Sequence, residues 1–352
     1  MQTVSDMPEF DNHELVTAVH DAATGLRGYI AVHTTRPGQA VGGTRLLAYA
    51  SPAAALADVL RLSRAMSYKC ALAGLPYGGA KAVIICPATG KSPNLLRAYA
   101  RVVENFGGLF RTGTDVGISD DDVRTMAGVS RYMVGAQTLD DPSLPTTSEM
   151  AAQGVFYAIQ AALAHATGRP DVAGRRVAVK GLGKLGGHLA NLLHAGGAQL
   201  VVADIDRQKV DGITAGRPEI SVLPPGQIHT AAVDVYAPCA LGGDLAEPEA
   251  ASLNARIVAG GANNQLANPG IAGVLSRRGI LYVPDYVANA GGLIHVTAEL
   301  EPGGYNLTTV QTRTQGIADT VRHILRQAEA EGRTTEAVAQ EIAEAKIWAA
   351  AG

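Results

Sequence analysis

Residues 176–190 read Arg-Val-Ala-Val-Lys-Gly-Leu-Gly-Lys-Leu-Gly-Gly-His-Leu-Ala, and this stretch decides the fold. A short apolar strand leads into glycines at positions 181, 183 and 186, and a helical pattern follows them. The first glycine permits a tight turn, the second lets backbone approach a pyrophosphate, and the third lets the helix pack against the strand. The helix N-terminus offers free N–H groups and a positive dipole end to the anion. The stretch therefore predicts a dinucleotide-binding turn, with these residues at the cofactor: Gly181, Gly183, Lys184, Leu185 and Gly186.

The residues after this turn bear on which dinucleotide is bound. A second strand, 199–203, leads to Asp204. A carboxylate there can accept hydrogen bonds from both hydroxyls of the adenine ribose, whereas a 2′-phosphate would meet a like charge. We therefore expect NAD, although Arg207 and Lys209 lie close enough in the sequence to keep NADP open. A glycine-rich turn can also be purely structural, but here strand, helix, second strand and terminal acid agree.

The pattern on either side of this motif predicts two domains in an α/β fold. Strands and helices alternate from the motif to about residue 292, which is typical of a parallel sheet with crossover helices. The polar, proline-containing residues 138–148 are the best candidate for a linker. Because 352 residues are too many for one ordinary core, we expect a first domain over residues 1–140 and a Rossmann domain over 141–319.

Local patterns outside the motif predict further elements. Ser51 and Pro52 begin a helix over 51–68, as N-cap and first-turn residue. The other expected elements are strands at 27–33 and 81–86, a glycine-marked loop at 38–45, and helices at 93–106, 149–167 and within 314–347.

Composition excludes several classes of function. A formal net charge of -3 gives no reason to expect a nucleic acid or an acidic membrane as partner. The three scattered cysteines indicate reduced thiols, with no disulfide framework and no metal site. No signal peptide and no apolar run of about 18 residues is visible, so we expect a cytoplasmic protein.

The first domain contains an unusual set of charged residues. Lys69 and Lys81 bracket an almost entirely apolar, glycine-rich segment, and Asp115 lies in a glycine-flanked turn. Desolvation and a second cation both lower the pKa of a lysine, which suits a general base. Two cations and an acid suit chemistry on a zwitterion. Taken singly, each residue is more often a solvated charge or a helix cap.

At this point the chain resembles the glutamate/leucine/phenylalanine/valine dehydrogenase family, within its leucine/phenylalanine/valine/tryptophan branch. The resemblance extends from Phe10 to about Ile347 and rests on ordered blocks. The blocks are Val41-Gly-Gly-Thr-Arg45, Met66-Ser-Tyr-Lys-Cys70, Gly78-Gly-Ala-Lys81, Thr112-Gly-Thr-Asp-Val-Gly117, Gly181-Leu-Gly-Lys-Leu-Gly186, Ala237-Pro-Cys-Ala-Leu-Gly-Gly243, Ala259-Gly-Gly-Ala-Asn-Asn264 and Pro284-Asp-Tyr-Val-Ala-Asn-Ala-Gly-Gly292.

The resemblance implies a role for each matching residue. Lys81 would activate water, and Asp115 would exchange protons with the amino group. Lys69 would bind the substrate carboxylate with help from the backbone of Gly42 and Gly43. The remaining implied contacts are Asn264 to the substrate amine, and Asn263, Pro238, Cys239 and Ala240 to the cofactor.

The resemblance also implies the reaction and the assembly. An L-amino acid would lose hydride from Cα to NAD, and water would add to the resulting iminium to give a 2-oxo acid and ammonia. The first domain would bind substrate and form a homo-oligomer of at least two subunits. A cleft would separate it from the NAD-binding Rossmann domain and close over the substrate. The C-terminal helices, about 320–352, would pack back on the first domain.

Four positions bear on the substrate side chain. Gly113 stands where leucine-type members have alanine, which makes room for a ring, while Val41, Leu293 and Val296 are apolar. Leu293 matches the tryptophan-type members, whereas His295 follows the phenylalanine-type pattern. One methyl discriminates by only roughly 1–3 kcal/mol. We therefore expect phenylalanine or tryptophan, with leucine or valine as the alternative.

One departure from the family leaves other readings open. Ala151 replaces a threonine that helps to seat the nicotinamide, although Thr146 or Thr147 could substitute. A catalytically idle, NAD-binding regulatory paralogue is the alternative from another class, but such a protein would be expected to lose Lys69, Lys81 or Asp115. A 2-hydroxy-acid dehydrogenase would generally use a histidine with an arginine, and no histidine lies in the blocks above.

Overall fold

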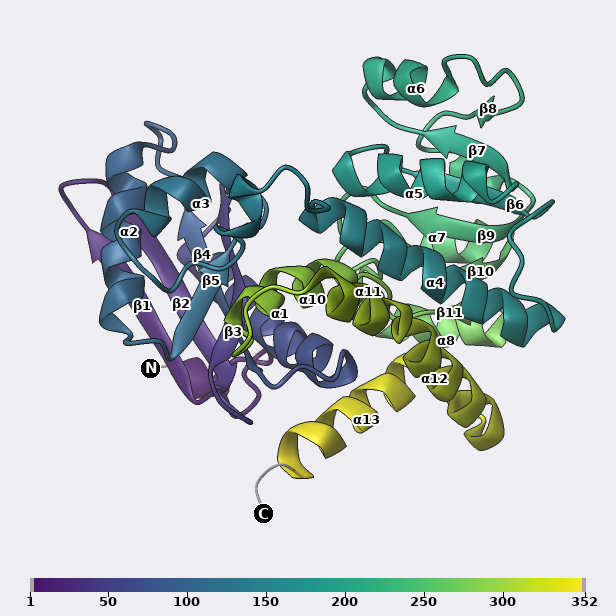
Figure 1. Ribbon diagram of the computed structural model, residues 1–352. Coiled ribbons are helices and arrows are strands. Elements are labelled where there is room, and N and C mark those ends of the chain that lie inside the picture. Colours follow the sequence, from purple (N-terminus) through teal and green to yellow (C-terminus); the bar gives the residue numbers. More distant parts are fainter. Residues whose placement is uncertain (1–2, 350–352) are drawn as a thin grey trace. The chain divides into compact units, whose positions relative to one another are not determined.

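The computed structural model describes residues 3–349, and the chain divides into two compact units (Figure 1). Unit 1 contains the residues up to Leu144, the segment Glu299–Tyr305 and the described residues from Ala343. Unit 2 contains Pro145–Ala298 and Asn306–Ile342.

Unit 1 is built on a five-stranded sheet with the strand order β1-β2-β4-β3-β5. Its strands are β1 (Leu15–Asp21), β2 (Leu26–Thr34), β3 (Ala40–Leu47), β4 (Gly78–Ile85) and β5 (Phe110–Gly113). β3 pairs in parallel with both β4 and β5, whereas β2 is antiparallel to β1 and β4. The carboxyl ends of β3, β4 and β5 therefore lie at the same edge of the sheet.

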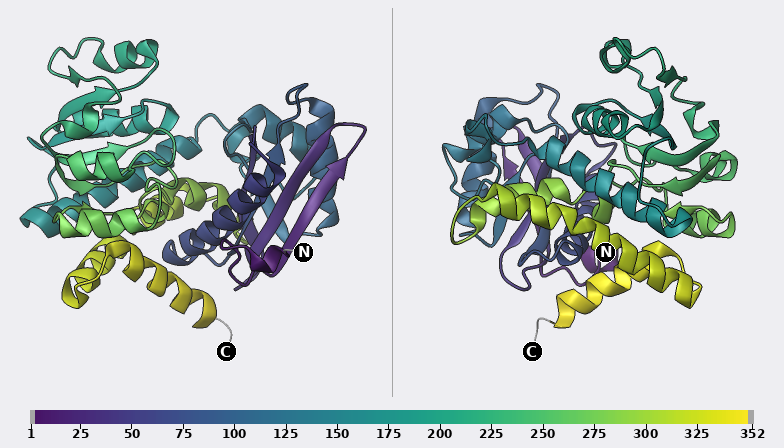
Figure 2. Two further views of the ribbon diagram at one scale, coloured as in Figure 1. Left: turned by 180° about the vertical axis from the view of Figure 1, so that it is seen from behind. Right: turned by 45° about the vertical axis from the view of Figure 1, so that its right-hand side comes forward.

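Helices cover both faces of this sheet. Successive strand residues point to opposite faces, so Val83 of β4 packs under α1 (Pro52–Leu72), while Ala82 and Ile84 pack under α2 (Pro93–Asn105) and α3 (Asp120–Ala127). Figure 1 shows α2 and α3 on one face, and the view from behind in Figure 2 shows α1 on the other. α1 begins as the sequence predicts, because Ser51 accepts a hydrogen bond from the Ala54 N–H at 3.1 Å.

The prediction of a loop at residues 38–45 is wrong, because β3 occupies most of this stretch. Gly42 does not break the strand. A Cβ atom there would overlap the carbonyl oxygen of Ala80, so the glycine is required for β3 to lie against β4. The reason for this glycine lies on the neighbouring strand and has no local signature in the sequence.

Unit 2 is a Rossmann-type domain with a six-stranded parallel sheet in the order β11-β10-β9-β6-β7-β8. This is the doubly wound order of dinucleotide-binding domains. The strands are β6 (Arg176–Lys180), β7 (Gln199–Ala203), β8 (Ser221–Val222), β9 (Val233–Pro238), β10 (Ala255–Val258) and β11 (Leu281–Tyr282). The helices between them are α5 (Lys184–Ala195), α6 (Arg207–Thr214), α7 (Glu247–Ser252) and α8 (Gly270–Arg277).

Further helices complete unit 2, and their placement differs from the expectation for the C-terminal tail. They are α4 (Thr147–Thr167), α9 (Asp285–Ala288), α10 (Gly291–Thr297), α11 (Leu307–Gln315), α12 (Ile317–Glu331) and α13 (Thr335–Ala349). α12 packs against α4 and buries Val321, Ile324 and Leu325. Residues 320–342 therefore belong to unit 2, and only the end of α13, from Ala343, belongs to unit 1. Among residues 3–349, no helix has the length and apolar character needed to span a membrane.

Candidate functional site

The structure brings Lys81 and Asp115 together in unit 1. Lys81 lies on β4, and Asp115 lies in the turn that follows β5. Lys81 Nζ forms an ion pair with Asp115 Oδ2, and each side chain is only 7% exposed. A buried ion pair costs desolvation energy and needs further polar partners, so its presence marks a place where charge is used.

Asp115 has a second cationic neighbour that the sequence did not single out. Arg45 of β3 directs Nε and Nη2 toward Asp115 Oδ1, each at 3.5 Å, and the Val116 N–H donates to the same oxygen at 2.5 Å. Burial alone would raise the pKa of Asp115, but Lys81 and Arg45 outweigh burial and hold that pKa at about 2. Asp115 is therefore a carboxylate at any working pH.

Glycines make room for this pair. A Cβ atom on Gly43 would lie 2.6 Å from the Thr114 carbonyl oxygen and 3.2 Å from Lys81 Nζ. Because Gly43 follows Gly42 on β3, two backbone units without side chains lie beside the charged pair. Both glycines allow protein groups to approach β3 closely, and contact of their backbone with a substrate stays a prediction.

Lys69 and Val41, two further predicted site residues, lie on elements that pack against β4. Lys69 is half-buried in the last turn of α1, the helix that packs against β4, and Val41 of β3 is fully buried. Met66, one turn earlier in α1, lies 3.4 Å from the position of a Cβ on Gly42. Lys69 thus lies on the helix that lines the glycine-bearing strand.

Gly113 has a close packing neighbour in the structure. A Cβ atom on Gly113 would lie 2.6 Å from the carbonyl oxygen of Val134. The segment containing Val134 is held beside β5 by backbone hydrogen bonds, with Val134 N donating to Thr112 O at 2.8 Å. In this chain a side chain at position 113 would need the segment containing Val134 to shift, and the role of Gly113 in the substrate pocket stays a prediction.

The glycine-rich turn of unit 2 has the geometry that the sequence predicts. Gly181 has φ +94°, and a Cβ there would lie 2.7 Å from the Ala240 nitrogen. A Cβ on Gly186 would overlap the Gly181 carbonyl oxygen, so Gly186 allows α5 to pack closely. A Cβ on Gly183, the N-cap of α5, would meet nothing within 4 Å. This open space at a helix N-terminus fits a pyrophosphate, and Lys184 and Leu185 form the first turn beside it.

Asp204 braces this turn from the end of β7. Its Oδ2 accepts from the Leu182 N–H at 2.6 Å, and its Oδ1 accepts from the Asp206 N–H at 2.8 Å. Each carboxylate oxygen has a second lone pair, so these bonds leave acceptor capacity for ribose hydroxyls.

The turn after β9 lies against the glycine-rich turn. Cys239 N donates to the Lys180 carbonyl oxygen at 2.7 Å, which places Pro238, Cys239 and Ala240 beside Gly181. Burial raises the pKa of the Cys239 thiol to about 12. Cys239 is therefore a neutral wall residue and not a nucleophile.

The paired asparagines have a partner that sequence reasoning missed. Asn289, which follows α9, donates through Nδ2 to Asn263 Oδ1 at 2.8 Å and to the Gly261 carbonyl oxygen at 3.2 Å. Its own buried Oδ1 has no hydrogen-bond partner among the described residues. Asn264 adopts a left-handed conformation with φ 53°. The sequence feature that could have pointed to Asn289 is its position inside the family-like block that ends at Gly292.

Ala151 and the apolar residues of α10 lie together within unit 2. The methyl group of Ala151 is 3.4 Å from the position of a Cβ on Gly292, while Thr146 serves as N-cap of α4. Leu293 and Val296, the expected side-chain pocket residues, are both half-buried on α10. Within residues 3–349 no group of three or more His, Cys, Asp or Glu side chains could hold a metal ion.

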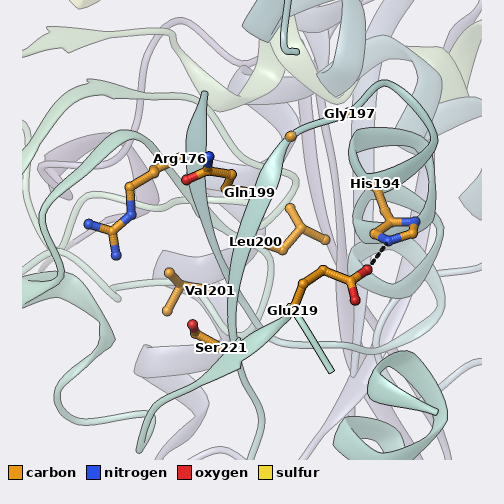
Figure 3. Close-up of a pocket in the computed structure, with 9 residues that line it drawn as sticks. Arg176, His194, Gly197, Gln199, Leu200, Val201, Glu219 and Ser221 are labelled. Carbon is orange, nitrogen blue, oxygen red and sulfur yellow. Dashed lines mark hydrogen bonds and ion pairs between the residues drawn. The ribbon is translucent and has the colours of Figure 1, made fainter. Parts of the chain in front are cut away.

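A hollow of about 710 Å³ in unit 2 lies away from these residues (Figure 3). Arg176 and Gln199, which line it, are the first residues of β6 and β7, so the hollow is at the amino ends of the strands. Dinucleotides bind at the carboxyl ends of a doubly wound sheet. The exposed His194–Glu219 pair in this hollow, 2.7 Å apart, is therefore unrelated to the cofactor turn.

Comparisons with known proteins agree with both units. Residues 13–137 match the family described as "Glu/Leu/Phe/Val dehydrogenase, dimerisation domain". Residues 144–215 and 200–351 match "Glutamate/Leucine/Phenylalanine/Valine dehydrogenase".

Proteins named for different amino-acid substrates are similar to the chain along almost its whole length. A valine dehydrogenase of Streptomyces virginiae is 41% identical over 95% of this chain and 94% of that protein. A phenylalanine dehydrogenase of Bacillus thermotolerans is 40% identical over 99% of this chain and 92% of that protein. The crystal structure of L-tryptophan dehydrogenase from Nostoc punctiforme superposes with a TM-score of 0.82 at 40% identity, covering 97% of each chain.

Proposed function

The chain belongs to the glutamate/leucine/phenylalanine/valine dehydrogenase family and is an amino-acid dehydrogenase, and we propose that it catalyses the reversible, NAD-dependent oxidative deamination of an apolar L-amino acid. The observation that carries this proposal is the buried Lys81–Asp115 pair beside Gly43. An idle, NAD-binding paralogue would have no reason to keep so costly an arrangement.

The residues of unit 1 divide the chemistry between them. Lys69 binds the α-carboxylate, and the backbone of Gly42 and Gly43 borders the same place. Bound NAD supplies the acceptor for the hydride that leaves Cα. Lys81 removes a proton from the water that attacks the resulting iminium carbon, and Asp115 moves protons to and from the amino nitrogen. Water adds one oxygen, ammonia leaves, and the products are a 2-oxo acid, ammonia and NADH.

The residues of unit 2 bind the cofactor. We assign the pyrophosphate to the α5 N-terminus at Gly183, and the adenine ribose to Asp204. The nicotinamide end would contact Asn263 and the turn at 238–240. The carboxylate of Asp204 favours NAD over NADP, because a 2′-phosphate beside it would be repelled.

The substrate is apolar, and we place aromatic amino acids first. Val41, Leu293 and Val296 carry no charge, and the relatives named above act, by their names, on valine, phenylalanine and tryptophan. Leu293 favours the tryptophan-type pattern. Leucine or valine is the alternative, since Gly113 has a packing role of its own. We also propose a homo-oligomer formed through unit 1, which matches a dimerisation domain.

The first test is NAD reduction at alkaline pH with a panel of L-amino acids, comparing wild type with Lys81→Ala and Lys91→Ala. Lys91 is a matched control because it also forms an ion pair with an aspartate of unit 1, Asp122. We expect turnover to fall by at least about 100-fold in Lys81→Ala and to persist in Lys91→Ala.

Each outcome of this panel has a distinct meaning. Higher turnover with phenylalanine or tryptophan than with leucine and valine supports the full proposal. A leucine or valine preference keeps the reaction and overturns the aromatic assignment. If NAD binds but no amino acid is turned over, the idle-paralogue reading replaces the proposed function.

A further inference from the structure

Arg45 connects the catalytic carboxylate to a second, non-catalytic one. Its Nη1 donates to Asp58 Oδ2 at 3.0 Å, while Nε and Nη2 face Asp115 Oδ1 at 3.5 Å. The side chains of Arg45 and Asp58 are each 13% exposed. This guanidinium links a strand, a helix and a turn, because Arg45 lies on β3, Asp58 on α1 and Asp115 after β5.

Asp58 is itself fixed by a donor from another segment. Tyr49, between β3 and α1, donates its hydroxyl to Asp58 Oδ2 at 2.6 Å. Arg61, one turn later in α1, comes no closer than 3.9 Å to Asp58 Oδ1 and its side chain is largely exposed, so it adds little to this anchor. The planar guanidinium of Arg45 therefore has one rigid acceptor on α1 and presents its remaining N–H groups to Asp115 in a fixed direction.

We propose that Arg45 is a positioning residue for the reaction, holding Asp115 ionised and oriented by a guanidinium anchored on Asp58 while Lys81 exchanges its proton. This inference rests on the proposed function for its kinetic consequences. Arginine stays charged throughout the working range of pH. Asp115 thus keeps a counter-ion at the moment when Lys81 is neutral.

The charges facing this cluster allow the effect of removing Arg45 to be worked out. Asp115 faces Lys81 of β4 and Arg45 of β3, and Asp58 faces Arg45, Tyr49 and Arg61. Without Arg45, Asp115 loses one of two cations, so its pKa rises. The catalytic pair as a whole also loses one neighbouring positive charge, which favours its protonated form, so the basic limb of the pH profile should move to higher pH.

The test is the pH profile of kcat/KM for wild type, Arg45→Gln, Arg45→Lys and Arg61→Gln. We expect Arg45→Gln to lower kcat/KM at neutral pH by about 10- to 100-fold, which corresponds to the energetic contribution of hydrogen bonds to a charged group. Its basic limb should move to higher pH by about one pH unit. Arg45→Lys restores the charge and hence the position of the limb, but only part of the rate, because an ammonium cannot bridge both carboxylates.

Arg61→Gln is the matched control, since Arg61 also contacts Asp58 but its side chain is 58% exposed. Arg61→Gln should leave the basic limb of the kcat/KM profile at the pH found for wild type. An Arg45→Gln profile that is lowered without moving overturns the proposal, because loss of structure alone lowers the rate at every pH.

A second measurement separates this proposal from the proposed function. The carboxyl ¹³C shift of Asp115, assigned with Asp115→Asn, is followed between pH 7 and 4. It should stay constant in wild type and begin to titrate in Arg45→Gln. Equal, constant shifts in both proteins overturn the role of Arg45 whatever the activity. Titration in the variant, in a protein that turns over no amino acid, overturns only the proposed function.

Discussion

Gly43 of β3 in unit 1 lies against the side chains of the Lys81–Asp115 pair, whereas the glycines of the 181–186 turn in unit 2 lie mainly against backbone or open space. Gly43 faces Thr114 O and Lys81 Nζ, and Lys81 is paired with Asp115. Gly183 faces nothing within 4 Å. The same residue type therefore serves two purposes, which are close approach of protein groups in one place and room for a ligand in the other.

This difference indicates which quantity each segment controls. In the proposed function, the chemistry of unit 1 depends on side chains whose charges influence one another, so substitutions there should alter rates and pH profiles. In unit 2 the proposed pyrophosphate site consists mainly of backbone N–H groups, so substitutions there should alter cofactor binding and local packing. The predictions below test this division of roles.

The largest effect is expected from Asp115→Asn. Replacing the carboxylate removes the proton acceptor and leaves Lys81 and Arg45 without their shared anion, so kcat/KM should fall by about 10²- to 10⁴-fold. Titration calorimetry should show NAD binding unchanged. Asp122→Asn is the control, because Asp122 is also paired with a lysine and its side chain is 12% exposed. Equal losses in both variants would mean that burial of a charge, not catalysis, explains the effect.

Acid provides the second test, because each unit buries a histidine whose pKa is lowered mainly by desolvation, to about 4. These are His33, beside Ser67 in unit 1, and His295 on α10 in unit 2. A lowered histidine pKa means that the folded state favours the neutral ring. The stabilisation is therefore complete above pH 6.5 and is lost as pH falls from 6.5 through 4.

For His33, which is 3% exposed, this loss is about 3 kcal/mol. Urea unfolding at several pH values should show a smaller decrease below pH 6.5 in His33→Asn than in wild type, since asparagine can keep the hydrogen bond to Ser67 without titrating. Parallel curves for the two proteins would contradict the prediction. The same urea-unfolding comparison of His295→Asn with wild type tests the prediction for unit 2.

The sequence predicted those features whose causes are local. The spacing of Gly181, Gly183 and Gly186 defines a turn within six residues, and Ser51 caps the helix that it precedes. The pairing of Lys81 with Asp115 was expected only through the resemblance to a family. No pattern in the sequence shows that two residues this far apart meet.

Features with distant causes were missed. The partners of Arg45 lie 13 and 70 residues away, and Gly42 is required by Ala80 on another strand. Gly113 was given a functional meaning, although Val134 supplies a packing reason. The C-terminal helices were placed by family likeness, whereas the apolar faces of α4 and α12 decide where they pack.

A pair of glycine substitutions sharpens the comparison within unit 2. Gly186→Ala forces a methyl group against the Gly181 carbonyl oxygen, so it should lower the free energy of unfolding by about 1–3 kcal/mol. Gly183→Ala should change that free energy by less than about 0.5 kcal/mol, because φ is -64° and the space is open. It should nevertheless weaken NAD binding, measured by calorimetry, because the methyl occupies the place of the pyrophosphate. Unchanged NAD affinity in Gly183→Ala would mean that the pyrophosphate does not bind at this turn.

The smallest effect concerns the choice between NAD and NADP. Asp204→Asn keeps an oxygen acceptor for the Leu182 N–H but removes the negative charge that repels a 2′-phosphate. The ratio of kcat/KM for NAD to that for NADP should fall by about 10-fold, the difference that one charged hydrogen bond makes. Asp206→Asn is the control, because Asp206 caps α6 and asparagine caps a helix equally well. If Asp206→Asn changes the ratio as much as Asp204→Asn does, the preference arises from the overall charge of this loop and not from a bond to the ribose.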